Sequence, residues 1–235
     1  MNIMSQSLRT MCAAVMLAGV LCGAELRAQG DFPRDKATSY LTIGPTFAGG
    51  ASMSISPPDG RKVAPSFAWR FGADMTYPLT PVVAGTFMLG YESRAVRLRG
   101  LNSSDVYESN RVGYLAITPG FQFGGFWVGM NFGLPLGGGV TRKNGPNSQE
   151  VSKDMDDEDF EKVDVTLEPR IGGVIPIHND ATGLLAITLN GGISLNQFFD
   201  ITDANGVVNE SLGNYQTVSA HMGISYQFAI QGTEK

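Results

Sequence analysis

Cysteine is almost absent from this chain, and histidine is scarce. The 2 cysteines, Cys12 and Cys22, both precede residue 28, in a segment that we expect to be removed on export. The mature chain therefore has no disulfide and no thiolate metal site. The 2 histidines, His178 and His221, are the only imidazoles available for acid–base chemistry.

Long apolar runs and excess positive charge are also missing. No stretch after residue 28 approaches the roughly 20 apolar residues of a spanning helix, which excludes that kind of membrane anchor from the mature chain. The 17 Lys and Arg residues are outnumbered by 22 Asp and Glu residues, giving a formal net charge of −5. This acidic balance disfavours nucleic acid as a partner.

The N-terminal segment has the three parts of a secretory signal. It contains Arg9, an apolar run over residues 11–23, and small residues up to Ala28. The apolar run is too short to span a membrane and is followed by a polar stretch, which is typical of a cleavable signal peptide. We expect residues 1–28 to be the signal peptide and residues 29–235 to form one domain.

The remaining sequence alternates between apolar and polar residues with a period of two. The clearest segment has a face of aromatic and aliphatic residues: Phe67, Trp69, Phe71, Ala73, Met75, Tyr77 and Leu79. The residues between them are small, polar or charged, and include Arg70 and Asp74. Such alternation predicts a β-strand with one apolar face.

Similar alternation recurs along the chain. We predict strands near residues 38–48, 65–79, 82–95, 112–123, 125–137, 163–177, 184–197 and 215–230. Segments of about ten alternating residues are typical of strands that face lipid in a transmembrane barrel. Aromatic residues near the predicted strand ends fit the girdles of such a barrel, and we assign Trp69, Tyr77, Tyr91, Trp127, Tyr226 and Phe228 to them.

The connections between these segments alternate between long and short. Residues 49–64, 96–111, 138–162 and 198–214 are long and polar, whereas residues 80–81, Gly124 and residues 178–183 are short connections. Outer-membrane barrels have long outer loops and short periplasmic turns. The sequence therefore predicts an all-β, eight-stranded, antiparallel up-and-down barrel in the bacterial outer membrane, with outer-membrane lipids around it.

Four stretches of the chain resemble the PorT-like outer-membrane β-barrel domain proteins. They are Phe67–Leu79, Leu89–Ser93, Tyr114–Pro119 and Pro169–Ile177. The last predicted strand, His221–Phe228, resembles the β-signal of outer-membrane proteins, with Gly223, Tyr226 and Phe228 at the characteristic spacing. This resemblance implies recognition by the barrel assembly machinery, although residues 229–235 extend beyond the usual terminal aromatic.

Few residues suggest chemistry. His221 shares a predicted face with Ser219 and Ser225, but no hydrolase motif surrounds them, and His178 lies in a predicted turn. The acidic residues 154–159 could attract Ca²⁺, yet they lack the glycine and glutamate of an EF-hand, so a solvated loop is favoured. We predict no catalytic, cofactor-binding or metal-binding residues and no enzyme activity.

The inward face carries charges of both signs. We assign to it Arg70, Asp74, Glu92, Arg94, Gln122, Asn131, Asp164, Glu168, Arg170 and His221. Packed into a narrow interior, these charges should pair across the lumen and fill it. We expect a structural or binding barrel with an unknown extracellular ligand or protein partner. The alternatives are a small porin and a lipid-modifying hydrolase.

Overall fold

A computed structural model describes residues 40–55, 61–80, 82–101, 105–154, 165–196 and 216–230. Its strands are β1 (Leu41–Ser54), β2 (Arg61–Ala64), β3 (Ser66–Pro78), β4 (Val83–Gly100), β5 (Val106–Phe123), β6 (Phe126–Asn144), β7 (Val151–Asp154), β8 (Thr166–Asn179), β9 (Gly183–Ile193) and β10 (Thr217–Ile230). In the described part of the chain, no helix is long and apolar enough to cross a membrane. The expected signal peptide lies outside the described residues.

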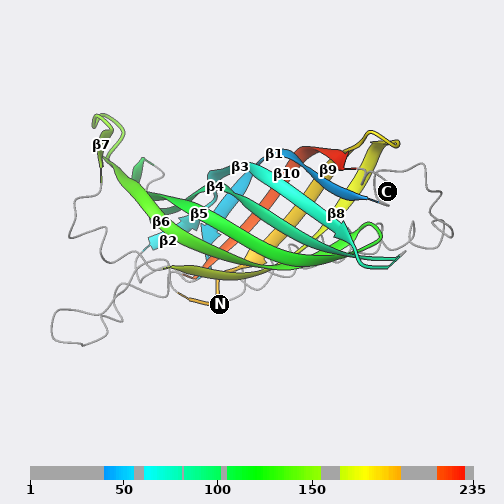
Figure 1. Ribbon diagram of the computed structural model, residues 1–235. Helices are drawn as coiled ribbons and strands as arrows, with labels where there is room; N and C mark the ends of the chain where they lie inside the picture. The colour runs from blue at the N-terminus through cyan, green and yellow to red at the C-terminus, as the bar shows by residue number, and fades with distance from the viewer. Residues whose placement is uncertain are drawn as a thin grey trace.

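Eight of these strands form a closed antiparallel ring, as the sequence predicts (Figure 1). The order around the ring is β4-β3-β1-β10-β9-β8-β6-β5, and β5 pairs again with β4. The first and last strands of the ring pair in antiparallel register from Leu41 opposite Ile230 to Ser54 opposite Thr217. Closure leaves the ring without an edge strand, as hydrocarbon requires.

Burial is inverted relative to a water-soluble protein. Large apolar side chains are exposed on the outer face, among them Phe47 at 58% and Ile224 at 58%. Polar neighbours on the same strands face inward, and Thr46 and Ser225 are almost fully buried. Ile187 lies on the outward face of β9, between the buried Ala186 and Thr188. Strands with an apolar exterior and a polar interior belong in lipid.

Short β2 and β7 lie outside the ring and extend it at one end. Residues 61–64 of β2 pair with the end of β4, and β7 pairs with the end of β6. Figure 1 shows β2 and β7 at the same end of the barrel, opposite the short turns. At that short-turn end, Gly124 adopts a φ of 60°, which favours glycine, where β5 turns into β6.

Three of the predicted long loops are wrong in their bounds, because the strands continue into them. β1 runs to Ser54 and β6 runs to Asn144, well past the predicted ends at residues 48 and 137. The predicted loop 96–111 is mostly a hairpin between β4 and β5, whose ladder continues to Arg99 opposite Tyr107. Polar residues on these extensions broke the apolar alternation from which we predicted the strands. The predicted loop 198–214 lies outside the described residues.

Candidate functional site

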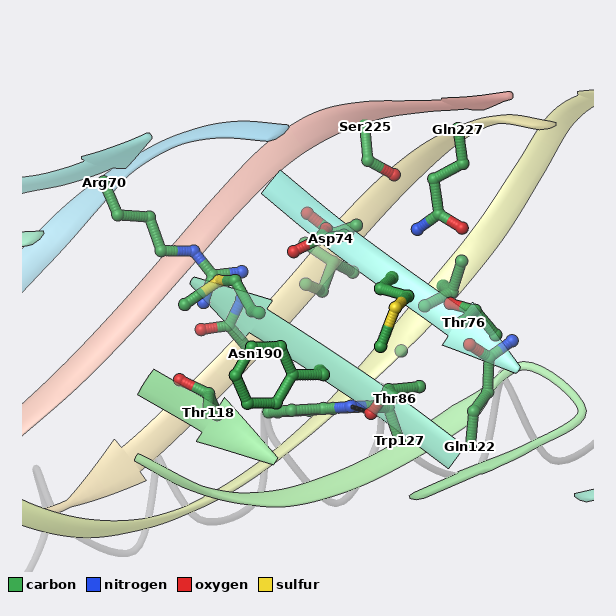
Figure 2. Close-up of a pocket in the computed structure, with 17 residues that line it drawn as sticks. Arg70, Asp74, Thr76, Thr86, Thr118, Gln122, Trp127, Asn190, Ser225 and Gln227 are labelled. Carbon is green, nitrogen blue, oxygen red and sulfur yellow. Dashed lines mark hydrogen bonds between the residues drawn. The ribbon is translucent and has the colours of Figure 1, made fainter. Parts of the chain in front are cut away.

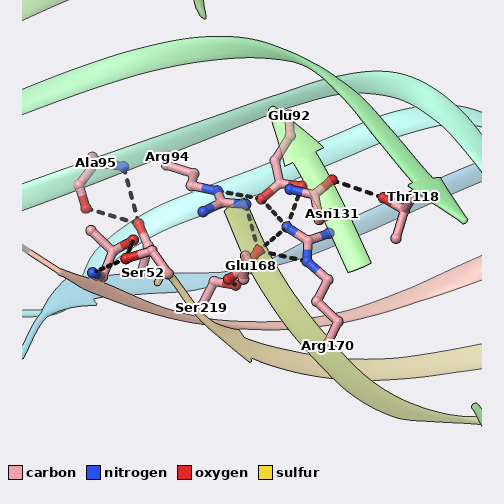
Figure 3. A network of polar contacts seen from close by, with 11 residues as sticks. Ser52, Glu92, Arg94, Ala95, Thr118, Asn131, Glu168, Arg170 and Ser219 are labelled. Carbon is pink, nitrogen blue, oxygen red and sulfur yellow. Dashed lines mark hydrogen bonds and ion pairs between the residues drawn. The ribbon is translucent and has the colours of Figure 1, made fainter. Parts of the chain in front are cut away.

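Four charged side chains meet across the lumen at mid-barrel (Figure 3). Arg94 donates from Nε to Glu92 Oε1 at 2.6 Å and from Nη2 to Glu168 Oε2 at 2.6 Å. Arg170 donates from Nε to Glu168 Oε2 at 2.6 Å and from Nη2 to both carboxylate oxygens of Glu92 at 2.7 Å. We call these four residues the charge cluster.

The cluster spans the barrel because its members come from strands that do not pair. Glu92 and Arg94 are on β4, and Glu168 and Arg170 are on β8. β4 and β8 are separated by β5 and β6 on one side of the ring and by four strands on the other. Hydrogen bonds between these strands therefore cross the interior and do not run along its wall.

Neutral polar groups complete the cluster. Ser219 on β10 donates its hydroxyl to Glu168 Oε1 at 2.7 Å. With the Asn131 amide oriented to satisfy both of its ends, Oδ1 accepts from Arg94 Nη2 at 2.8 Å and from Arg170 Nη2 at 3.2 Å. Its Nδ2 then donates to Thr118 Oγ1 at 2.8 Å. All four carboxylate oxygens thus have partners.

The cluster is fully buried and electrically neutral. Arg94 and Arg170 are 1% exposed, and Glu92 and Glu168 are 0% exposed. Burying an isolated charge is costly, but two arginines and two carboxylates cancel, and short charge-assisted hydrogen bonds offset the lost hydration. The arrangement places a neutral, hydrogen-bonded polar layer across the lumen.

Buried apolar side chains line one wall of the lumen on the long-loop side of the cluster. Val96 and Leu98 on β4 and Val112 on β5 are buried there, next to Tyr114. The Arg94 guanidinium lies 5.7 Å from the centroid of the Tyr114 ring, within cation–π range. These apolar side chains come from two adjacent strands, and buried polar residues, such as Asn110 and Ser54, lie at the same end of the lumen.

The short-turn half of the lumen contains a cavity of about 60 Å³ (Figure 2). We call it the chamber. Labelled side chains around it are Arg70, Asp74, Thr76, Thr86, Thr118, Gln122, Trp127, Asn190, Ser225 and Gln227. A cavity of this size and polarity has room for a few water molecules.

Arg70 corrects the prediction that every lumen arginine pairs with a carboxylate. It is 6% exposed, and within the described ranges no carboxylate oxygen lies at ion-pair distance from it. Its Nε, both polar side-chain atoms of Asn190, and the hydroxyls of Thr188 and Ser225 lack hydrogen-bond partners in the described part of the chain. We expect water to solvate these groups.

Trp127 corrects a second prediction. We assigned it to an aromatic girdle, but its side chain lines the chamber, and its Nε1 donates to Thr86 Oγ1 at 2.7 Å. Trp127 lies between Phe126 and Val128, which face outward. Strict alternation of faces along β6 would therefore have predicted that Trp127 faces the lumen. The girdle at the opposite end contains Trp69, Phe71 and Tyr91, whose ring centroids lie 5.2–5.8 Å apart.

The histidines and serines do not form a catalytic pair in the described structure. Ser219 donates its proton to Glu168, and both ring nitrogens of His221 and the Ser225 hydroxyl have no hydrogen-bond partner there. His178, predicted to lie in a turn, is the second-last residue of β8, and its Nε2 is 2.7 Å from Asp180 Oδ2 in the turn that follows. Hydrogen bonds from Thr182, His178 and the backbone of the turn hold the pKa of Asp180 well below its usual range.

Among the described residues, no group of three or more His, Asp, Glu or Cys side chains could hold a metal ion. Of the acidic residues 154–159, only Asp154 is described, at the end of β7. Asp164, which we assigned to the lumen, lies outside the described residues. Asn190 and Thr118 are chamber or cluster residues that we did not include in the predicted inward set.

Comparison with known proteins gives only distant structural likenesses. No protein-family profile and no curated protein matches the chain. Ail, the attachment invasion locus protein of Yersinia pestis, aligns with a TM-score of 0.40 and 13% identity over 81% of this chain and 99% of Ail. The outer membrane protein OprG from Pseudomonas aeruginosa aligns with a TM-score of 0.35 and 12% identity over 86% of this chain and 100% of OprG.

The N-terminal β-barrel domain of Pseudomonas aeruginosa OprF aligns with a TM-score of 0.26 and 10% identity, over 80% of this chain and 99% of that domain. These likenesses are too distant to support an argument. The chain is an outer-membrane β-barrel protein on the evidence of its own structure: a closed antiparallel ring, an apolar outer face and a polar buried interior.

Proposed function

We propose that this protein is a non-conducting outer-membrane barrel that acts through the surface at its long-loop end. The observation that carries the proposal is the charge cluster, which joins β4 to β8 across the lumen. Eight strands enclose an interior that side chains can fill. A barrel closed in this way has no continuous path for solutes, so its outer surface is left for structural or binding roles.

The two alternatives are less well supported. A porin needs an open lumen, and steady conductance from the pure protein would favour it over our proposal. A hydrolase needs an activated nucleophile near the membrane face, whereas Ser219 is hydrogen-bonded to Glu168 and His221 has no serine within hydrogen-bond distance. We therefore propose that the protein is not an enzyme.

The orientation of the barrel can be tested on intact cells. Ser152 on β7 lies at the long-loop end and is exposed, whereas Asn179 lies at the end of β8 beside a short turn. We expect Ser152→Cys to react with a membrane-impermeant thiol reagent and Asn179→Cys to react only after the outer membrane is permeabilised. Labelling in the reverse order would place the long loops in the periplasm and contradict the proposal.

We also propose that β10 is the strand recognised by the barrel assembly machinery. Tyr226 and Phe228 form an edge-to-face aromatic pair at 4.7 Å, and β10 closes the ring against β1. Replacing both aromatics by alanine should reduce the amount of folded barrel in the outer membrane more than deleting residues 231–235 does. Equal amounts of folded barrel for the two variants would contradict the proposed role of β10 in assembly.

Within the outer-membrane barrels, we propose membership of the PorT-like domain family. The stretches that resemble this family coincide with strands: residues 67–79 with β3, 89–93 with β4, 114–119 with β5 and 169–177 with β8. Alignment of the chain with a broad set of PorT-like sequences would test this. A better alignment with another barrel family over the same strands would contradict it.

A further inference from the structure

A groove of about 650 Å³ lies outside the lumen, where β4, β5, β6 and β7 extend past the membrane-spanning part of the barrel. It is separate from the charge cluster and the chamber. Its polar and charged lining includes Tyr91, Arg97, Arg111, Glu150, Ser152 and Asp154. A concave site of this volume is large enough for a small organic ligand.

Glycine keeps the floor of the groove open. Gly113 lies beneath Tyr91, and a Cβ added there would be 2.0 Å from the Tyr91 hydroxyl oxygen. On β6, Gly138 and Gly139 line the groove, and a Cβ added at Gly139 would meet only the backbone oxygen of Lys153 at 3.4 Å. Glycine within a strand often marks a place where a ligand approaches the backbone closely.

The walls of the groove carry both guanidinium and carboxylate groups. Arg111 donates from Nη1 to Ser93 Oγ at 3.1 Å, and Arg97 lies 4.9 Å from the centroid of the Tyr107 ring. The Nε of Arg97 is buried and has no hydrogen-bond partner in the described part of the chain. On the β7 side, Glu150 accepts a hydrogen bond from the Tyr107 hydroxyl at 2.5 Å.

The groove begins at the level of the membrane interface. Tyr91, which lines it, also belongs to the aromatic girdle with Trp69 and Phe71. Aromatic girdles mark the boundary between the hydrocarbon and the headgroups. The arginines lie further along the same strands, since Arg97 is on β4 six residues beyond Tyr91 and Arg111 pairs with Ala95. They are therefore at headgroup height on the long-loop side.

We propose that this groove binds the phosphorylated sugar headgroup of a glycolipid in the outer leaflet. Guanidinium groups bind phosphate in a bidentate geometry. Carboxylates accept hydrogen bonds from sugar hydroxyls, and protein hydroxyls can donate to sugar oxygens or accept from sugar hydroxyls. A site with Arg97, Arg111 and Glu150 around a glycine floor matches both parts of such a headgroup. The height of the groove places it where that headgroup lies.

The proposal rests on the proposed function, because it requires the long-loop end to face outward. It is tested with the purified full-length barrel in detergent, titrated with a diphosphorylated lipid A and followed by native mass spectrometry. We expect Arg97→Gln combined with Arg111→Gln to weaken binding by about tenfold or more, the effect of losing one strong charge-assisted hydrogen bond. Gly139→Leu should also weaken binding, because Gly139 lines the groove and the added side chain fills it without changing its charge.

Arg61→Gln combined with Arg142→Gln is the matched control. It removes two arginines from the same end of the barrel, both outside the groove, and should leave binding within about twofold of wild type. Each variant is first shown to be folded by its heat-dependent shift in gel mobility, and Gly139→Leu provides a test of the groove that is independent of charge.

Three results would overturn the proposal. They are equal binding by the wild type and both groove variants, equal binding of lipid A after removal of its phosphates, and binding of soluble glucosamine 1-phosphate as tight as that of the lipid. The last result would identify a soluble sugar phosphate as the ligand. If any of these binding results is obtained and the protein shows no conductance, the proposed function still stands. Steady conductance would contradict the proposed function, whatever the groove binds.

Discussion

The charge cluster and the chamber lie in the same lumen and contain the same kinds of residue, yet their charges are satisfied differently. In the cluster, Glu92 and Arg94 are two residues apart, as are Glu168 and Arg170, so each pair occupies adjacent inward positions. In the chamber, Arg70 and Asp74 are four residues apart on β3. That spacing separates their Cα atoms by about 13 Å along a strand.

The comparison shows that spacing along the strand matters as much as the balance of charge. Two close pairs on opposite strands interlock into one neutral layer that crosses the barrel. A single distant pair leaves Arg70 without an ion-pair partner among the described residues and leaves space that water can fill. The same balance of signs therefore seals one part of the lumen and hydrates another.

The largest effect is expected from breaking the cluster. Arg170→Ala removes hydrogen bonds to Glu168 and to Glu92 and leaves two buried carboxylates with a single arginine. Loss of one partner from a buried ion pair costs about 3–5 kcal/mol. We expect the free energy of unfolding, measured with guanidinium for the barrel in lipid vesicles, to decrease by this amount. A decrease below about 1 kcal/mol would mean that the cluster is not a stabilising unit.

The second-largest effect is expected from a charge placed on the lipid face, and the neighbouring chamber wall provides the comparison. Ile187 and Thr188 are neighbours on β9, but Ile187 faces lipid and Thr188 lines the chamber. We expect Ile187→Arg to cost about 2–4 kcal/mol, because it places a charge in hydrocarbon. Thr188→Arg should cost less, since it enters a polar space and acts by crowding. Equal costs in the same unfolding experiment would show that the assigned faces are wrong.

Arg70→Ala should have a smaller effect than Arg170→Ala. Arg70 makes no ion pair with a described carboxylate, and water can replace it in the chamber next to Asp74. We expect a loss of about 1 kcal/mol in the free energy of unfolding. This revises the sequence-based prediction, in which removing Arg70 leaves a directly paired carboxylate without its partner. A loss as large as that of Arg170→Ala would restore that prediction.

The smallest effect is expected at a carboxylate outside both regions. Asp180 accepts hydrogen bonds from Thr182 and Gly183 in the exposed turn, and its pKa is lowered by them. Its contribution to stability is therefore present above the ordinary pKa of an aspartate, about 3.9, and is lost as the pH falls below it. The stability advantage of the wild type over Asp180→Asn should shrink as the pH falls from about 5 towards 2. A difference in stability that does not change with pH would show that the titration of Asp180 does not contribute to the stability of the protein.

Much of the barrel could be predicted from the sequence because alternation and loop length report it directly. The outward position of Phe47 and Ile224 and the inward position of Arg94 and Glu168 follow from a period of two, and the structure confirms them. The outer ends of the strands could not be predicted in this way, because residues beyond the membrane need no apolar face. The ladder between β4 and β5 nevertheless continues past Val96.

The candidate sites were harder to predict because they depend on which strands face each other. Sequence alone placed Arg70 and Arg170 on the inward face, but the ring decides which carboxylates each can contact. The groove was missed entirely, since it requires β7 to fold back onto β6 beside Gly139. A run of three glycines, residues 137–139, was the available signal, and we interpreted it only as the end of a strand and the start of a loop.

Single-channel recording in planar bilayers tests the central claim most directly. The account predicts that the pure wild-type protein shows no stable conductance, because the charge cluster joins β4 to β8 across the lumen and closes it. The protein must first be shown to be folded in the same bilayer lipids by its gel mobility. Steady, reproducible conductance steps from the folded wild type would contradict the claim and favour a porin.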